Sequence, residues 1–200
     1  MSLPLLNAQD VTVSRGARRI LEGLNLNVGE GELWQLVGGN GIGKTSLMRV
    51  LAGVTRLGVE GDIGLRETPL FLGHASAIKP LLSAYDNLRW HPSGAVQADR
   101  GAVSAALSAV GLEHCGESPV GQLSAGQQRR VALARLWLTQ SKLWLLDEPF
   151  TAIDVSGARL LEAQLQAHVA GGGSVVFSSH QPNQFSTELR VFDLSEYACD

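Results

Sequence analysis

The feature that most constrains this chain is a glycine-rich segment at residues 38–46, which matches the pattern G-x-x-x-x-G-K-[ST] without a gap. The apolar run 33–37 before it is typical of a buried strand, and the run 47–52 after it predicts a helix that ends at Gly53. A strand, then this loop, then a helix is the order in which the pattern binds phosphate. The alternative, a chance glycine-rich turn before a helix, is disfavoured by the complete pattern in this context.

The residue types in this segment suit a nucleotide phosphate and its metal ion. The glycines let successive backbone N–H groups turn inward, and the amino end of the next helix adds a partial positive charge. The Lys44 side chain can reach the β- and γ-phosphates, and the Thr45 hydroxyl can bind Mg²⁺. The predicted nucleotide-binding residues of this segment are Gly38, Gly39, Asn40, Gly41, Ile42, Gly43, Lys44, Thr45 and Ser46.

Composition narrows the class of protein. The 200 residues, 44% of them hydrophobic and 18% charged, suit one globular domain with a substantial core. A net charge of −3 without a basic block argues against nucleic acid as a direct partner. Cys115 and Cys199 have neither metal-binding spacing nor a disulfide pattern, which suits a reducing cytoplasm. No signal peptide or membrane-spanning run is evident, so we expect any membrane role to be that of a peripheral subunit.

Apolar runs predict a mainly parallel sheet preceded by antiparallel strands. The strands 5–13 and 20–28 are expected to pair with each other, and short β-like pieces fall within 54–68. Further strands are expected at 33–37, 69–72, 142–146, 174–178 and 190–194, with a helix over 154–170. Because strands alternate with helices, the sequence predicts an α/β fold with a mainly parallel sheet.

In residues 75–122 the apolar runs typical of strands give way to helical spacing and loop residues, and we expect this range to form a helical lobe. Ser83 is predicted to cap a helix with Asp86 three residues later, and residues 91–94 break that helix. A second helix is expected within 97–110 and closes at Gly111. We therefore expect a single domain over 1–200, in which 1–74 and 123–200 form the core and 75–122 the inserted lobe.

The strand 142–146 ends in two carboxylates, Asp147 and Glu148. A parallel strand places its last residues at the edge of the sheet where ligands bind. One acid there can hold Mg²⁺ and the other can deprotonate the attacking water, so we assign Asp147 to the metal and Glu148 to the general base. A solvated acidic turn is the alternative for such a pair seen alone. The phosphate loop elsewhere in the chain disfavours it.

Residues 123–130 (LSAGQQRR) predict a second anion-binding turn before a helix. Ser124 suits the N-cap position, and Gly126 allows the backbone to approach a ligand closely. Taken alone, the segment is more typical of an ordinary capped helix.

The order of these motifs resembles the ABC-transporter ATPase domain. LSAGQ resembles the family signature LSGGQ with Ala125 in place of a Gly, residues 149–154 resemble the D-loop with Asp154 as its acid, and Ser178-Ser179-His180 resembles the switch-histidine segment. The resemblance extends from the strand 5–13 to His180. It implies a P-loop NTPase fold, ATP and Mg²⁺ as cofactors, and catalytic roles for Lys44, Glu148 and His180. Alone, His180 would be read as a satisfied core or surface histidine.

The resemblance also implies that two copies bind head to tail. Each ATP would then lie between the phosphate loop of one copy and Ser124, Gly126 and Gln127 of the other.

Two positions depart from the family pattern. The Gln that the family places after the strand 69–72 falls on His74, which can bind the Mg²⁺ shell or a water, or be inert. The aromatic residue that stacks on adenine falls on Arg15, whose guanidinium can also stack on a base. ATP rather than GTP follows from the resemblance, and no guanine-binding [NT]KxD pattern is present.

Within the family, the phrase DEPFTAID at 147–154, His74 itself and Ser179-His180-Gln181 resemble the ATP-binding subunits of haem exporters in cytochrome c maturation. This implies an ATP hydrolase peripheral to the cytoplasmic face of the inner (plasma) membrane. Its partners would be transmembrane transporter subunits and haem-handling proteins. Its function would be haem export or the release of a haem chaperone.

Other functions stay open. They are the ATPase of another ABC transporter, for metals, lipids or drugs, a soluble ABC ATPase, and an inactive regulatory subunit. The last is disfavoured because Lys44, Asp147, Glu148 and His180 are all present.

Overall fold

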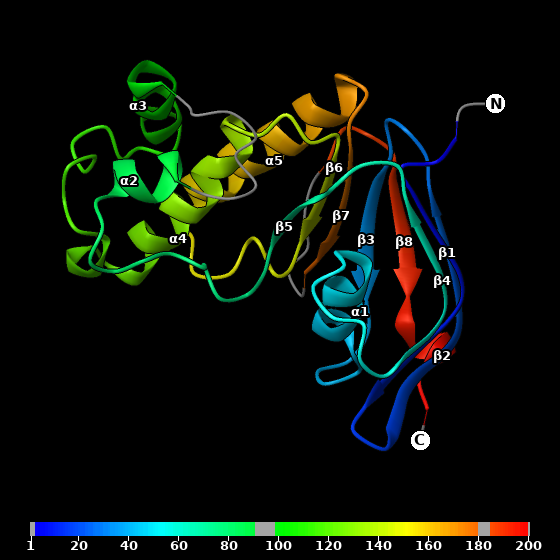
Figure 1. Cartoon of the computed structure of the whole chain (residues 1–200). Helices are drawn as coiled ribbons and strands as arrows, with labels where there is room; N and C mark the ends of the chain where they lie inside the picture. Colours follow the sequence, from blue (N-terminus) through cyan, green and yellow to red (C-terminus); the bar gives the residue numbers. More distant parts are fainter. Residues whose placement is uncertain (1–2, 91–98, 180–184, 200) are drawn as a thin grey trace. The chain divides into compact units, whose positions relative to one another are not determined.

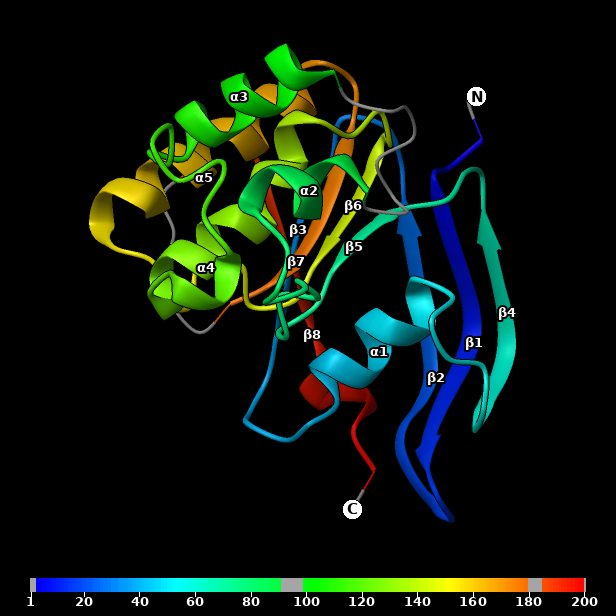
Figure 2. The same ribbon diagram turned by 60° about the vertical axis from the view of Figure 1, so that its left-hand side comes forward.

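The computed structural model describes residues 3–90, 99–179 and 185–199, and the chain forms two compact units. The first unit comprises Met1–His74, Ser141–Pro149 and Leu165–Asp200, and the second comprises Ala75–Gln140 and Phe150–Gln164. The second unit contains the expected lobe at 75–122 together with two further stretches, 123–140 and 150–164. Figures 1 and 2 show the elements of each unit.

The first unit is built on a five-stranded parallel sheet with the order β5-β6-β7-β3-β8. Its strands are β3 (Leu33–Val37), β5 (Leu70–Leu72), β6 (Leu143–Leu146), β7 (Ser174–Ser178) and β8 (Leu189–Asp193). Every residue of β6 and β7 is buried, as is usual for parallel strands covered on both faces. The predicted parallel sheet is confirmed, and β7 lies between β6 and β3.

A three-stranded antiparallel sheet accompanies it, with the order β2-β1-β4. It consists of β1 (Leu6–Arg15), β2 (Arg18–Val28) and β4 (Val59–Leu65), so the predicted pairing at the start of the chain is confirmed. Gly61 of β4 has a φ of 89°, and a Cβ atom there would lie 2.3 Å from the carbonyl oxygen of Asp10. Only glycine allows β4 to approach β1 so closely at this register shift.

One apolar cluster joins both sheets to helix α1 (Lys44–Leu51). Leu47, Met48 and Leu51 of α1 are fully buried and pack in this cluster with residues of β1, β2, β3, β6 and β7. Both views show α1 alongside these strands (Figures 1 and 2). The packing fixes the amino end of α1, and with it the glycine-rich loop that joins β3 to α1.

The second unit is helical. It contains α2 (Ala84–Arg89), α3 (Arg100–Ala109), the 3₁₀ turns η1 (Val120–Gln122) and η2 (Ala134–Trp137), α4 (Ala125–Leu133), and the first part of α5 (Val155–Ala170). The predicted cap of α2 is confirmed, because the Ser83 hydroxyl accepts a hydrogen bond from the Asp86 backbone N–H at 3.0 Å. The predicted break at 91–94 lies outside the described residues. None of the helices in the described ranges has the length and apolar character needed to cross a membrane.

Candidate nucleotide-binding and hydrolysis site

Several predicted site residues lie at one edge of the parallel sheet. β3 leads into the phosphate loop (residues 38–46), β6 leads into Asp147 and Glu148, and β7 between them ends at Ser178. All three strands are parallel, so their carboxyl ends meet at the same edge, which is where open parallel sheets bind ligands. The sheet therefore brings together segments that lie far apart in the sequence.

The backbone of the phosphate loop depends on glycine. Gly38, Gly41 and Gly43 have φ angles of 142°, 81° and 122°, which residues with side chains rarely adopt. Gly43 is the N-cap of α1, so this conformation sets where the helix begins. Gly39, Asn40 and Gly41 at the tip of the loop are exposed, whereas Gly38 and Ile42 are half-buried.

Lys44 lies across the loop rather than out in solvent. Its side chain is buried, and its ammonium donates hydrogen bonds to the carbonyl oxygens of Gly38 at 2.8 Å and Gly39 at 3.2 Å. Thr45 and Ser46 follow in the first turn of α1 and are half-buried. The loop thus combines a buried ammonium group, two residues that carry hydroxyls and the amino end of a helix, which together suit a phosphate group.

Ser178 connects the two acidic residues. Its hydroxyl donates a hydrogen bond to Oδ1 of Asp147 at 2.9 Å and accepts one from the backbone N–H of Glu148 at 2.9 Å. Ser178 and Asp147 are completely buried, and Glu148 is half-buried. Glu148 has a φ of 49°, which is uncommon for a residue with a side chain. One buried hydroxyl therefore orients the Asp147 carboxylate and holds the backbone of Glu148.

The segment that leads to His180 is anchored in a similar way. The Gln35 side chain in β3 donates a hydrogen bond to the carbonyl oxygen of Ser179 at 3.3 Å, and Ser179 is buried. His180 itself lies outside the described residues. Sequence reasoning did not identify Gln35 or the bridging role of Ser178, because both depend on the pairing of strands that are distant in the sequence.

Arg15 lies beside the phosphate loop, at the end of β1. Its guanidinium donates a hydrogen bond to the Ser46 hydroxyl at 3.1 Å. An open cleft of about 480 Å³, here called the Arg15 cleft, runs from this point along the loop. It is lined by Arg15, Arg18, Ile20, Gly39, Asn40, Gly41, Ile42, Ala198 and Cys199. The predicted base-contacting residue and the predicted phosphate-binding loop thus border one cleft.

Ser124 and Gln127 begin helix α4 in the second unit. The Ser124 hydroxyl accepts a hydrogen bond from the Gln127 backbone N–H at 3.2 Å, and Gln127 Oε1 accepts one from the Ser124 backbone N–H at 2.9 Å. This capping box uses the hydroxyl as an acceptor and the amide through its oxygen, so both side chains can still donate hydrogen bonds. Ser124 is exposed, and the arrangement suits an anion that approaches from outside the chain.

Gly126 lies in the first turn of α4, against the D-loop segment 149–154. A Cβ atom at Gly126 would lie 3.2 Å from the carbonyl oxygen of Ala152. Asp154 of the same segment pairs with Arg130 at 2.8 Å, and the pKa of Asp154 is lowered, chiefly by a hydrogen bond from the Gly157 backbone N–H. The signature turn and the D-loop are therefore packed together within the second unit.

The residues predicted for a metal fit Mg²⁺ bound together with phosphate. In the described part of the chain, no three His, Cys, Asp or Glu side chains gather so as to hold a metal by themselves. Mg²⁺ usually binds through one or two carboxylates, waters and substrate phosphates, which suits the buried Asp147 carboxylate and the Thr45 hydroxyl. His74 is exposed and follows β5, whose Leu72 carbonyl accepts the Asp147 N–H at 2.8 Å.

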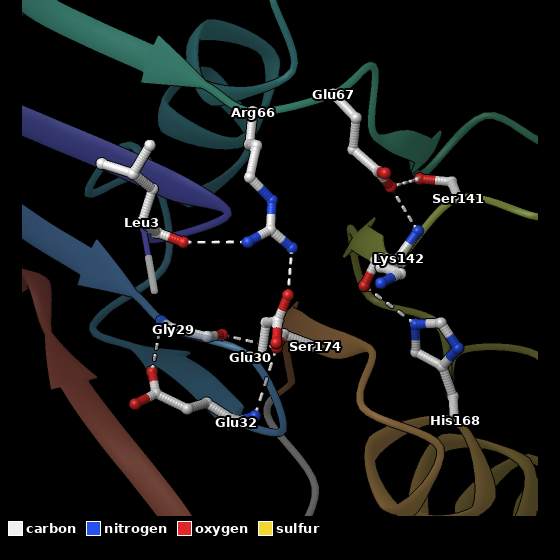
Figure 3. A network of polar contacts seen from close by, with 10 residues as sticks. All are labelled: Leu3, Gly29, Glu30, Glu32, Arg66, Glu67, Ser141, Lys142, His168 and Ser174. Atoms are coloured by element: carbon white, nitrogen blue, oxygen red, sulfur yellow. Dashed lines mark hydrogen bonds and ion pairs between the residues drawn. The ribbon is translucent and has the colours of Figure 1, made fainter. Parts of the chain in front are cut away.

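A second polar network lies at the opposite edge of the sheet (Figure 3). Arg66 pairs with Glu30 and donates a hydrogen bond to the Leu3 carbonyl oxygen at 3.0 Å, and this pairing lowers the pKa of Glu30. Nearby, the Ser174 hydroxyl donates to the Gly29 carbonyl at 2.6 Å. These contacts join the segments before β1 and after β4 to the amino ends of β3 and β7, away from the candidate site, so we assign them to stability.

Comparisons with known proteins agree with this geometry. The family model "ABC transporter" matches residues 21–151. The cytochrome c biogenesis ATP-binding export protein CcmA of Idiomarina loihiensis is 40% identical to this chain. The alignment covers 94% of this chain and 94% of that protein. The protein of the same name from Haemophilus ducreyi is 42% identical, with 98% of this chain and 99% of that protein aligned.

Solved structures show the same fold. A putative ABC transporter ATP-binding protein from Pyrococcus furiosus superposes with a TM-score of 0.80 at 25% identity, over 97% of this chain and 99% of the other. With a family model over more than half of its length and relatives aligned over nearly all of it, the chain belongs to the ABC transporter family, as an ATP-binding subunit similar to the cytochrome c biogenesis ATP-binding export proteins.

Proposed function

We propose that this chain is the ATP-hydrolysing subunit of a membrane transporter that serves haem export or haem-chaperone release in cytochrome c maturation. The observation that carries the proposal is the sheet edge where the phosphate loop, Asp147, Glu148 and Ser178 come together. The names of the relatives supply the cargo class, since they are cytochrome c biogenesis ATP-binding export proteins.

ATP binding uses the glycine-rich loop of the first unit. The loop N–H groups, the amino end of α1 and Lys44 meet the phosphates, and Arg15 with the Arg15 cleft receives the base end. On phosphate binding, the Lys44 ammonium exchanges its carbonyl contacts for phosphate oxygens. Thr45, Asp147 and His74 are the residues that would hold Mg²⁺, and the ion would supply positive charge that offsets the negative charge of the phosphates.

Hydrolysis uses Glu148 as the general base. Glu148 takes a proton from a water whose oxygen attacks the γ-phosphorus, and the bond from that phosphorus to the β–γ bridging oxygen breaks to give ADP and phosphate. His180 contacts the γ-phosphate. Ser178 keeps the backbone of Glu148 in its strained conformation, so that the base does not need to reorganise during the reaction.

The site is completed by a second copy of the chain. Ser124, Gly126 and Gln127 of one copy donate to the γ-phosphate bound by the other, which suits the donor hydrogens left by the capping box. Closure of the pair around two ATP molecules and its reopening after hydrolysis drive the transmembrane subunits. We place the chain at the cytoplasmic face of the inner membrane, held there by those subunits and near haem-handling proteins.

The test is a Glu148→Gln variant, assayed in a strain that lacks the wild-type gene. We expect the variant to bind ATP with unchanged affinity but to lose hydrolysis by about 10² or more, because the base is removed while the phosphate loop is intact. Haem staining should then show no mature c-type cytochromes. Lys44→Ala is the matched control that loses ATP binding itself.

Two results would contradict the proposal, each in a different part. Rapid ATP hydrolysis by the Glu148→Gln variant would show that Glu148 is not the general base. Normal c-type cytochromes in the presence of an inactive variant would assign the ATPase to another ABC transporter.

A further inference from the structure

The Arg15 cleft has a wall that the known nucleotide-binding motifs do not supply. Its volume of about 480 Å³ lies within the roughly 300–1,000 Å³ typical of small-molecule sites. The phosphate loop occupies one side through Gly39, Asn40, Gly41 and Ile42. The part left for the ribose and base of a nucleotide is bordered by Arg15, Arg18, Ile20, Ala198 and Cys199.

The segment 194–199 is fixed firmly enough to act as a wall. Leu194 is fully buried in the core of the first unit, and Ala198 forms an antiparallel bridge with Leu21 of β2. The Cys199 backbone N–H donates a hydrogen bond to the Ile20 carbonyl oxygen at 3.2 Å. These contacts attach the segment at both of its ends to elements that also position the phosphate loop.

The turn within this segment is also held. Asp193 Oδ1 accepts hydrogen bonds from the Ser195 backbone N–H at 2.9 Å and from its hydroxyl at 2.7 Å. These bonds favour the ionised carboxylate and so lower the pKa of Asp193. Tyr197 stacks on Phe192 with ring centroids 5.3 Å apart, which orients the chain just before Ala198.

The chemistry of the two walls is complementary to a planar base. Arg15 and Arg18 face each other across the hairpin of β1 and β2 and supply guanidinium planes. Ala198, which lines the same cleft, is exposed and small, and Cys199 is half-buried, with its thiol 3.7 Å from Oε2 of Glu22. Among the residues that line the cleft in the described chain, none is aromatic. The base therefore needs a second surface, and segment 194–199 provides it.

We propose that Ala198 and Cys199 form the wall of the base end of the nucleotide site, so that bound ATP covers the Cys199 thiol. The inference rests on the proposed function, since it takes ATP as the ligand of the phosphate loop. It makes Ala198 and Cys199 determinants of nucleotide binding, although they lie far in the sequence from every nucleotide-binding motif.

The test measures how fast N-ethylmaleimide alkylates Cys199 in a Cys115→Ser background. With Mg-ATP at ten times its dissociation constant, we expect labelling to slow by about tenfold, because only the unoccupied fraction still reacts. Inorganic triphosphate occupies the phosphate loop without a base and should leave the rate unchanged. A Lys44→Ala variant in the same background should show no protection by ATP.

The outcomes separate this inference from the proposed function. Calorimetry that detects ATP binding while Cys199 labels at its free rate overturns the inference alone. Equal protection of Cys199 by triphosphate also overturns it, because the protection would then come from occupancy of the phosphate loop and not from the nucleotide base. Failure of the wild-type chain to bind ATP overturns the proposed function and this inference with it.

A steric variant gives an independent measurement. Ala198→Trp adds bulk to an exposed position in the cleft, so the fold should be kept while ATP affinity falls about tenfold. Triphosphate affinity should not change. Glu196→Trp is the matched control, because Glu196 is exposed in the same segment but does not line the cleft. Equal ATP affinities for both variants would contradict a wall at Ala198.

Discussion

At the scale of single residues, the site depends on a strained backbone held by one hydroxyl. Glu148 keeps a φ of 49°, a conformation that costs free energy and persists only where neighbours enforce it. Its backbone N–H donates a hydrogen bond to the Ser178 hydroxyl, and that hydroxyl in turn donates a hydrogen bond to the Asp147 carboxylate. The Ser178 hydroxyl is therefore a positioning group that acts on the Asp147 carboxylate and on the Glu148 backbone at once.

We expect Ser178→Ala to lower kcat for ATP hydrolysis about tenfold. The substitution removes the acceptor that Ser178 offers to the Glu148 N–H and the donor that it offers to the Asp147 carboxylate, a loss of about 1–3 kcal/mol in a buried site. ATP affinity without Mg²⁺ should stay as in the wild type, because the phosphate loop is untouched, whereas the Mg²⁺ concentration for half-maximal rate should rise.

Ser178→Thr is the matched control, since it keeps the hydroxyl and places a β-branched residue, which strands favour, at this position. It should recover most of the rate. If Ser178→Thr and Ser178→Ala hydrolyse ATP equally, with equal thermal stability, Ser178 does not position the acids.

At the scale of elements, sequence patterns predicted most strands and helices closely. The strand 33–37 and the strand 174–178 match β3 and β7, and the helix expected over 154–170 is α5. These elements carry their own signals, namely unbroken apolar runs and glycine or capping residues at their ends. For β4 the sequence indicates only short pieces, because this strand contains Gly61 and Gly64 and its pairing with β1 includes a register shift.

The carboxyl-terminal end of α5 belongs to the first unit and is held within it by an aromatic contact. The His168 ring stacks on Trp144 with centroids 3.6 Å apart, and its Nε2–H donates to the Lys142 carbonyl oxygen at 3.1 Å (Figure 3 shows the hydrogen bond). Burial lowers the pKa of His168 below the ordinary 6.5, although the bond to Lys142 and the charge of Glu67 act in the opposite direction. The imidazole is therefore neutral in the folded chain at physiological pH.

This contact predicts a loss of stability in acid. Below pH 6.5 the unfolded chain binds a proton at His168 that the folded chain resists, so the free energy of unfolding falls as the pH drops through 6.5 toward the lowered folded pKa. Thermal melts between pH 7.5 and pH 5.5 should show a smaller decrease in Tm for His168→Phe, which keeps the stacking but cannot be protonated. Parallel curves for wild type and variant would show that His168 does not contribute.

At the scale of the whole molecule, the sequence indicates the candidate site residues more directly than it indicates the contacts that join them. The motifs that surround Lys44, Asp147 and Ser124 are short and continuous in the sequence, so each can be recognised without the others. The order β6-β7-β3, the Ser178 bridge and the bridge of Leu21 with Ala198 arise from long-range pairing. No local pattern encodes that pairing, because it depends on the free energy of the assembled sheet.

A head-to-tail pair can be tested with two inactive variants that fail for different reasons. Lys44→Ala removes the phosphate-binding cation. Ser124→Asp keeps a good N-cap for α4 but sets a negative charge where the partner's γ-phosphate would lie. Circular dichroism should show that both variants are folded, and each alone should hydrolyse ATP at a background rate.

Mixing the two variants should restore hydrolysis. In a mixed pair, the loop of the Ser124→Asp copy meets the intact signature of the Lys44→Ala copy, so one of the two sites is whole. Random mixing makes half of the pairs mixed, and with independent sites we expect about a quarter of the wild-type rate. A site completed within one chain would give no gain over the separate variants. Recovery on mixing, measured as phosphate release against total subunit concentration, therefore distinguishes a shared site from a self-contained one.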